Sequence, residues 1–234
     1  MSDAVLEVRG VSIGYEDRVV CRNIDFTLQS GECLAIVGGS GSGRSSLIRI
    51  ILGVEQPISG EVIFGDGLTK NDIGCLPQRE PDRVSHSTVR DIVLSGCLRR
   101  GLLPFFTKAD RQIMSERLHL VGIADIAGRR FSELSGGMQQ KVMLARALCA
   151  AKKLLLLDDP VHGLDQTTTN DIYGLIETIC MSGMPVVMVS SDPPAVLRLS
   201  THILHLADEM AFFGTKEAYL TTYAGRMFEA GVIL

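Results

Sequence analysis

The stretch from Cys33 to Leu52, CLAIVGGSGSGRSSLIRIIL, constrains the fold of this chain more than any other. It opens with an apolar run, Cys33 to Val37, which has the length of a buried strand, and it closes at helical density from Leu47 onward. The loop between these runs holds four glycines, which let backbone N–H groups turn toward a single ligand. A strand, a glycine loop and a helix N-terminus together favour binding of phosphate groups.

This loop nearly matches the phosphate-loop pattern G-x-x-x-x-G-K-[ST]. Gly38, Gly43 and Ser45 fit the pattern, whereas Arg44 occupies the lysine position. A single near-match is weak, so the interpretation depends on what the rest of the chain supplies.

Composition limits the class of protein. With 234 residues and 46% hydrophobic content, the chain can bury one substantial core, with room for an inserted subdomain. A net charge of −4 without a basic stripe argues against a nucleic-acid partner. Six scattered cysteines without a C-x-x-C pair are interpreted as small core residues of a reduced, cytosolic protein, rather than as metal or redox groups.

Neither a targeting signal nor a membrane span is expected. Asp3, Glu7 and Arg9 interrupt any apolar N-terminal region, and no apolar run reaches the roughly 18 residues that a membrane-spanning helix needs. Any role at a membrane would therefore require partner proteins.

Residues 4–30 alternate between apolar and polar side chains, which predicts an antiparallel sheet. Tyr15, at its first turn, is either an ordinary strand aromatic or a side chain that stacks on a purine. Further strands are expected at 60–64, after which Asp66-Gly67 forms a turn, and at 73–76, where Gln78 follows and can offer its amide oxygen to a metal ion or water.

From Ser87 to Ala150 the pattern becomes helical. Thr88 and Thr107, each with an aspartate three residues later, suit helix starts. The apolar loop between these helices, residues 99–106, either folds back onto the core or docks on a partner. Ser135 suits the N-cap of a helix over 138–150, and the two glycines after it leave that N-terminus open to an anion.

The run KLLLLDD at 153–159 predicts a buried parallel strand with Asp158 and Asp159 at its carboxyl end, where open α/β sheets bind ligands. A turn, Gly163-Leu164-Asp165, a helix over 167–181 and a second buried strand over 186–189 should follow. His202 and His205 are spaced to face opposite sides of a strand, so a shared metal site is not expected.

Taken together, these residues resemble the ATP-binding subunit of an ABC transporter along nearly the whole chain. The pieces occur in that family's order: phosphate loop, glutamine loop, signature, acidic strand end and D-loop turn. The resemblance implies an α/β fold, a P-loop NTPase (RecA-like) core with an N-terminal antiparallel β-subdomain and an inserted helical subdomain. Residues 1–234 would form a single ABC ATP-binding domain, with the helical subdomain at about 87–150.

The resemblance also implies a role for each motif residue. Tyr15 would stack on adenine, while Mg²⁺ would be held directly or through water by Ser45, Gln78 and Asp158. Asp159 takes the place of the glutamate that orients the attacking water, and Ser191 takes the place of the switch histidine. The groups that would contact ATP bound by the same subunit are Gly38, Gly39, Ser40, Gly41, Ser42, Gly43, Arg44, Ser45 and Ser46. Those that would act on the ATP of a second subunit are Leu134, Ser135, Gly136, Gly137, Met138 and Asp165.

Three departures from the family pattern fall on the chemistry. Arg44 keeps the charge of lysine in a planar guanidinium, Asp159 withdraws a carboxylate by one methylene, and Ser191 replaces an imidazole by a hydroxyl. His162, near the same strand end, is a candidate to compensate. These departures suggest a site that binds MgATP and turns it over slowly.

More locally, 77–79, 88–94 and 99–110 look like the zinc, manganese and iron importers of the family. The resemblance implies a second ATP-binding subunit, identical or different, and a membrane-spanning permease, with the chain in the cytoplasm at the inner face of the membrane and not itself inserted. Three functions remain open: an energising ATPase of a metal importer, a hydrolysis-deficient nucleotide-binding subunit paired with a competent ATPase, and a soluble ABC protein without a transporter.

Overall fold

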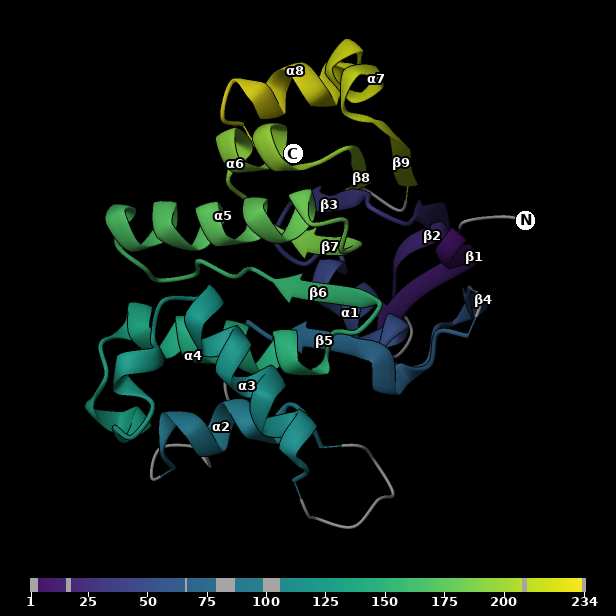
Figure 1. Ribbon diagram of the computed structural model, residues 1–234. Helices are drawn as coiled ribbons and strands as arrows, with labels where there is room; N and C mark the ends of the chain where they lie inside the picture. Colours follow the sequence, from purple (N-terminus) through teal and green to yellow (C-terminus); the bar gives the residue numbers. More distant parts are fainter. Residues whose placement is uncertain are drawn as a thin grey trace. The chain divides into compact units, whose positions relative to one another are not determined.

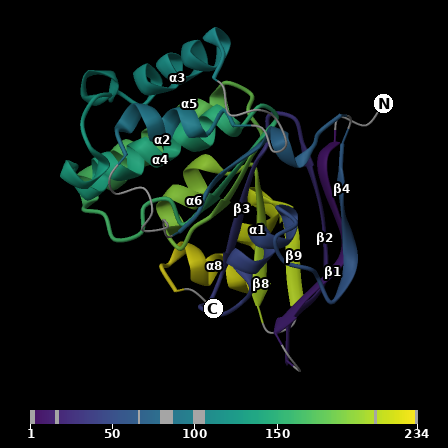
Figure 2. The same ribbon diagram turned by 90° about the horizontal axis from the view of Figure 1, so that it is seen from below.

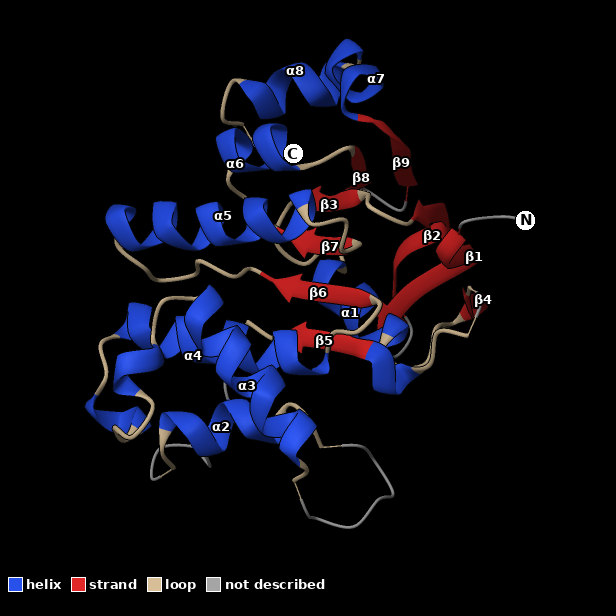
Figure 3. Ribbon diagram, in the orientation of Figure 1, coloured by secondary structure: helices blue, strands red, loops and turns tan. Residues whose placement is uncertain are grey.

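The computed structural model describes residues 4–15, 18–65, 67–78, 87–98, 106–207 and 210–232. The chain divides into two compact units, the first formed by Met1–Thr69 with Ile179–Leu234 and the second by Lys70–Thr178. Both contain helices and strands (Figures 1 and 3). Among the described residues, no helix combines the length and the apolar character needed to cross a membrane.

An antiparallel sheet in the first unit confirms the prediction for residues 4–30. Its strand order is β2-β1-β4, and the three strands run side by side in Figure 2. Alternate side chains of the sheet are buried, as the sequence pattern indicated; Leu6, Val8 and Ile24 are at most 1% exposed. The bounds are β1 Ala4–Tyr15, β2 Arg18–Gln29 and β4 Ser59–Phe64.

A mainly parallel set of strands forms the core of the first unit. Strand β3 lies between β7 and β8 and pairs in parallel with both, and β9 pairs antiparallel with β8. Every residue of β3 is buried, which explains its continuous apolar sequence. The bounds are β3 Cys33–Gly38, β7 Val186–Val189, β8 His202–Ala207 and β9 Met210–Thr215.

Helices of the C-terminal part cover one face of these strands, where α6, α7 and α8 gather in Figure 1. Tyr219 and Phe228, both at most 1% exposed, pack there against Ala35, Val37 and Ile203. Helix α1, Arg44–Ile51, follows β3, and the other bounds are α6 Pro193–Leu199, α7 Lys216–Thr221 and α8 Tyr223–Glu229.

The second unit holds two parallel strands and most of the helices predicted from 87 onward. Strands β5 (Ile73–Leu76) and β6 (Leu154–Asp158) pair in parallel, and the four leucines of β6 are completely buried. Helix α4 packs against β5, α2 and α3. The helices are α2 Val89–Ser95, α3 Lys108–Leu120, α4 Gly136–Ala150 and α5 Gln166–Met181, the last of which ends in the first unit.

Side-chain caps begin these helices where the sequence indicated. The Thr88 hydroxyl accepts from the Asp91 N–H, and Thr107 and Asp110 form a reciprocal capping box. Residues 99–105 of the apolar loop and Asp66 of the predicted 66–67 turn lie outside the described residues, so neither the packing nor the docking interpretation of that loop is tested.

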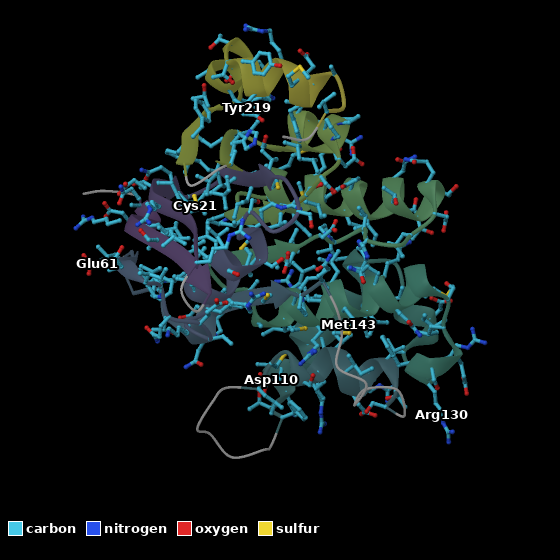
Figure 4. The ribbon with its side chains drawn as sticks, turned by 180° about the vertical axis from the view of Figure 1, so that it is seen from behind. Cys21, Glu61, Asp110, Arg130, Met143 and Tyr219 are labelled. Atoms are coloured by element: carbon cyan, nitrogen blue, oxygen red, sulfur yellow. The ribbon has the colours of Figure 1, made fainter. Side chains whose placement is uncertain are left out.

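One polar pair lies inside the first unit's core. Tyr219, labelled in Figure 4, has its hydroxyl 2.7 Å from His205 Nδ1, and the His205 side chain is 4% exposed. Burial raises the pKa of Tyr219 to about 12. Each of these two buried polar groups thereby gains a hydrogen-bond partner.

We expect Tyr219→Phe to lower the free energy of unfolding by about 1–2 kcal/mol, because it removes the hydroxyl and leaves a buried imidazole nitrogen without that contact. Tyr223→Phe is the matched control: Tyr223 is 66% exposed, and its change should stay within about 0.5 kcal/mol. Urea unfolding at pH 7 measures both. Equal losses in the two variants would contradict the importance of the buried pair.

The same residue predicts a pH dependence. The folded pKa of about 12 lies above the ordinary value of 10, so the unfolded chain releases this proton first as the pH rises. The stabilisation from a neutral, buried Tyr219 is therefore full below about pH 10 and is lost between about pH 10 and 12. Urea unfolding across this range should show a shallower decline in Tyr219→Phe than in the wild type.

Candidate nucleotide-binding site

The glycine loop follows the carboxyl end of β3 in the first unit. Gly38, Gly41 and Gly43 have positive φ angles of 144°, 82° and 93°, which L side chains rarely adopt. A Cβ atom at Gly38 would collide with the carbonyl oxygen of Leu206 and lie 2.8 Å from Ser42 Oγ. The loop thus requires glycine both for its backbone turns and for space.

The N-terminus of α1 opens directly from this loop. Its N-cap is Gly43, which has no side chain to accept from the helix, and no acidic residue lies in its first turn. The buried Ser42 Oγ has no hydrogen-bond partner among the described residues. Helix N–H groups without a competing carboxylate, beside an unsatisfied buried hydroxyl, are suited to a phosphate-bearing ligand. The residues present therefore fit ATP phosphates.

Ser191 reaches the same edge of the first unit. Strands β3 and β7 are parallel neighbours, with Ile36 opposite Val189, so the residues after each strand share one edge. Ser190 is buried and its hydroxyl accepts from the Asp192 N–H at 3.1 Å, while Ser191 itself is exposed. The exposed Ser191 can therefore be approached by a ligand from solvent.

A second group of predicted residues comes together in the second unit. Leu76 of β5 lies opposite Leu157 of β6, which brings Gln78 and the acidic strand end to a common edge. Gln78 Nε2 lies 3.5 Å from Asp159 Oδ2. Asp158 is 7% exposed, a buried carboxylate of the kind expected of a metal ligand.

Two features of this edge were missed by sequence reasoning. Asp159 adopts a left-handed backbone conformation with φ of 52°, rare for a residue other than glycine. His162 Nδ1 lies 3.3 Å from Asp159 Oδ2, so the histidine noted as a candidate to compensate contacts the Asp159 carboxylate. Only the spacing of three residues across a turn could have indicated this contact.

The signature and the D-loop turn pack against one another in the same unit. Ser135 is the N-cap of α4 as predicted, and its hydroxyl accepts from the Met138 N–H. A Cβ atom at Gly137 would collide with the side chain of Thr168. Thr168 donates from its hydroxyl and its N–H to Asp165, and these bonds hold the pKa of the Asp165 carboxyl below its usual range.

The exposure of the signature differs along its length. Leu134 is buried, whereas Ser135 and Gly136 are exposed and Met138 is 40% exposed. The open N-terminus of α4 can therefore be approached by an external anion. The Tyr15 side chain, predicted to stack on adenine, lies outside the described part of the structure.

Comparisons with known proteins agree with these motifs. The ABC transporter family model matches residues 21–162. The chain is 34% identical over 233 residues to the manganese transport system ATP-binding protein MntB of Bacillus subtilis, covering 95% of this chain and 93% of that protein. It is 34% identical over 218 residues to the zinc import ATP-binding protein ZnuC of Ruegeria pomeroyi, covering 93% and 80%.

Solved structures show the same fold. One described as an inward-facing metal-chelate type ABC transporter superposes with a TM-score of 0.84 at 26% identity, covering 98% of this chain and 90% of that chain. The ADP-bound ATP-binding cassette MJ1267 superposes with a TM-score of 0.83 at 20% identity, covering 97% and 99%, and supports the P-loop NTPase fold alone. The chain belongs to the ABC transporter family and is one of its ATP-binding subunits, with ABC-type ATPase activity.

Proposed function

We propose that this chain binds and hydrolyses MgATP to drive import of a divalent transition-metal ion through membrane subunits. The observation that carries the proposal is the ordered set of phosphate loop, Gln78, signature and acidic strand end, in a chain 34% identical to the ATP-binding proteins of a manganese and a zinc transport system. Residues 1–234 would act as a single ABC ATP-binding domain, with the helical subdomain 87–150 inserted.

The chain's own groups would divide the chemistry between them. Loop amides, the N-terminus of α1 and Arg44 would bind the phosphates. Ser45, Gln78 and Asp158 supply the oxygen ligands that Mg²⁺ prefers. When bound, Mg²⁺ neutralises charge that develops on the phosphate oxygens. Asp159 would orient the attacking water, and Tyr15 would stack on the adenine.

Other groups of the chain would serve its partners. The exposed serine and glycine of the signature would approach ATP bound by a second ATP-binding subunit, identical to this chain or different. A membrane-spanning permease would hold the pair at the cytoplasmic face of the membrane. The metal ion would be the cargo of those membrane subunits and would not touch this chain.

A second candidate rests on Arg44, Asp159 and Ser191. All three departures fall on groups that would act on the chain's own nucleotide, whereas the signature and D-loop, which would act on the opposite nucleotide, are nearly intact. The chain would then hold its ATP as a clamp and complete the site of a different, competent ATPase. Normal turnover in a homodimer would exclude this arrangement.

The triple variant Arg44→Lys, Asp159→Glu, Ser191→His should hydrolyse ATP about 10- to 100-fold faster than the wild type with similar ATP affinity, because misplacing a catalytic group by about 1 Å costs on the order of 100-fold in rate. Steady-state phosphate release and nucleotide titration measure the two quantities on the purified chain. Asp125→Glu extends an exposed carboxylate outside these motifs and is the control. Equal rates in the wild type and the triple variant would show that the substitute side chains suffice.

His162→Ala should lower kcat about fivefold and leave ATP binding unchanged, because the lost contact with Asp159 is worth about 1 kcal/mol. His162→Asn, which keeps a donor, should recover part of the rate. His119→Ala removes an exposed histidine of α3 and serves as the control. A faster His162→Ala enzyme would instead mean that this histidine restrains Asp159 in an unproductive position.

Deleting the gene should lower the cellular content of manganese, zinc or iron, measured by mass spectrometry of washed cells. Wild-type protein and Gly128→Ala should restore it, because a Cβ atom at Gly128 meets nothing within 4 Å. Gly137→Ala should not, because its Cβ atom would displace Thr168 at the signature. Unchanged metal content after deletion would overturn metal import while leaving ATPase activity as a separate question.

A further inference from the structure

Two cysteines distant in the sequence meet in the second unit. Cys97 follows α2 by two residues, and Cys149 lies in the last turn of α4. A hydrogen bond joins their thiols. Gly96, the residue before Cys97, lies close to α4: a Cβ atom built on it would lie 2.9 Å from Cys149 Cβ and would collide with the carbonyl oxygen of Arg146.

The packing at the end of α2 brings the chain next to Cys97 close to α4. Cysteines that form a disulfide have Cα atoms about 4.4–6.8 Å apart and Cβ atoms that face each other. The absence of a side chain at Gly96 lets the end of α2 approach α4 directly beside this pair. Cys97 lies in the turn after α2 and Cys149 lies on α4, so a bond between them would cross-link two parts of the unit.

The two thiols have different environments. Cys97 is partly exposed and donates to the Asp110 carbonyl oxygen at 3.7 Å, whereas Cys149 is 6% exposed. The hydrogen bond with Cys149 lowers the pKa of Cys97, helped by the cations of Arg117 and Lys152 and opposed by burial and Asp110. The same hydrogen bond and burial raise the pKa of Cys149. Cys97 is thus the thiol that solvent can reach, and its surroundings favour the thiolate.

Arg117 contributes a positive charge near Cys97. Its Nε is buried and has no hydrogen-bond partner among the residues that the structure describes. This cation, on α3, favours a thiolate at Cys97. Asp110, whose place at the start of α3 is labelled in Figure 4, provides an opposing negative charge that raises the pKa of Cys97.

We propose that Cys97 and Cys149 form a hydroperoxide-sensitive dithiol that closes to a disulfide between the turn after α2 and α4. The Cys97 thiolate attacks one oxygen of hydrogen peroxide, the O–O bond breaks, and the departing hydroxide takes up a proton to give water and a sulfenic acid. The Cys149 sulfur then attacks Cys97 sulfur, the S–O bond breaks, and the thiol proton leaves with hydroxide as a second water. Two thiols are oxidised and one peroxide is reduced.

A second thiol pair provides an internal comparison. Cys33 and Cys180 are also joined by a hydrogen bond, in the first unit, but Cys33 is 1% exposed and lies in the fully buried strand β3. The hydrogen bond to Cys180 and burial raise the pKa of Cys33 well above its usual range. This pair should therefore react much more slowly than Cys97 and Cys149.

The test treats the reduced full-length chain with a small excess of hydrogen peroxide, alkylates the remaining thiols, and maps the peptides by mass spectrometry. Two of the six cysteines should escape alkylation, in one cross-linked species that contains Cys97 and Cys149. The melting temperature should rise by several degrees, because the bond closes a long loop of the unfolded chain. Cys149→Ser should leave Cys97 as a sulfenic acid that dimedone traps.

Cys180→Ser is the matched control and should leave the cross-link unchanged, whereas Cys97→Ser should abolish it. Because the wild-type peptide map identifies the linked residues directly, the test does not depend on either variant folding well. A cross-link between Cys33 and Cys180, or six thiols still alkylated after peroxide treatment, would overturn the proposal.

Discussion

The burial of strand β3 is the constraint on which the first unit depends. Hydrogen bonds to β7 and β8 occupy both of its edges, and its side chains from Cys33 to Val37 are at most 1% exposed. Because burial strongly specifies the register of a strand, the position at which β3 ends relative to its neighbours is also specified. The glycine loop begins at that end point, where Gly38 fits against the Leu206 carbonyl only because it lacks a Cβ atom. The geometry of the phosphate loop is therefore set by packing outside the loop.

Helix α4 has the corresponding place in the second unit. Its neighbours approach it through glycines: Gly74 of β5 and Gly96 after α2 both lie against the backbone near its C-terminal end, where a side chain would collide. The same helix begins with the signature, capped by Ser135, and ends beside Cys149. A substitution or cross-link at the C-terminal end of α4 thus acts on the same helix that carries the signature at its N-terminal end.

The strands and helix caps that depend on neighbouring residues could be predicted from the sequence. Alternation in residues 4–30, the leucine run of β6 and the caps at Thr88 and Thr107 are each decided by neighbours a few positions away. The contact of His162 with Asp159 and the meeting of Cys97 with Cys149 depend on turn geometry and tertiary packing, which periodicity does not contain. The prediction that the six cysteines are small core residues fits the three that are buried. The other three, Cys75, Cys97 and Cys180, are only partly buried.

The left-handed conformation of Asp159 explains how a shorter carboxylate can persist at this position. Aspartate enters this region more readily than most L residues, because its short polar side chain can hydrogen-bond locally, and here it meets both His162 and Gln78. Aspartate suits this left-handed turn, and its carboxylate reaches one methylene less far than that of glutamate. Under the proposed function, phosphate binding would rely on backbone N–H groups of the glycine loop and would not depend on the side chain at position 159. Nucleotide affinity and hydrolysis rate would then be able to diverge without any change in the fold.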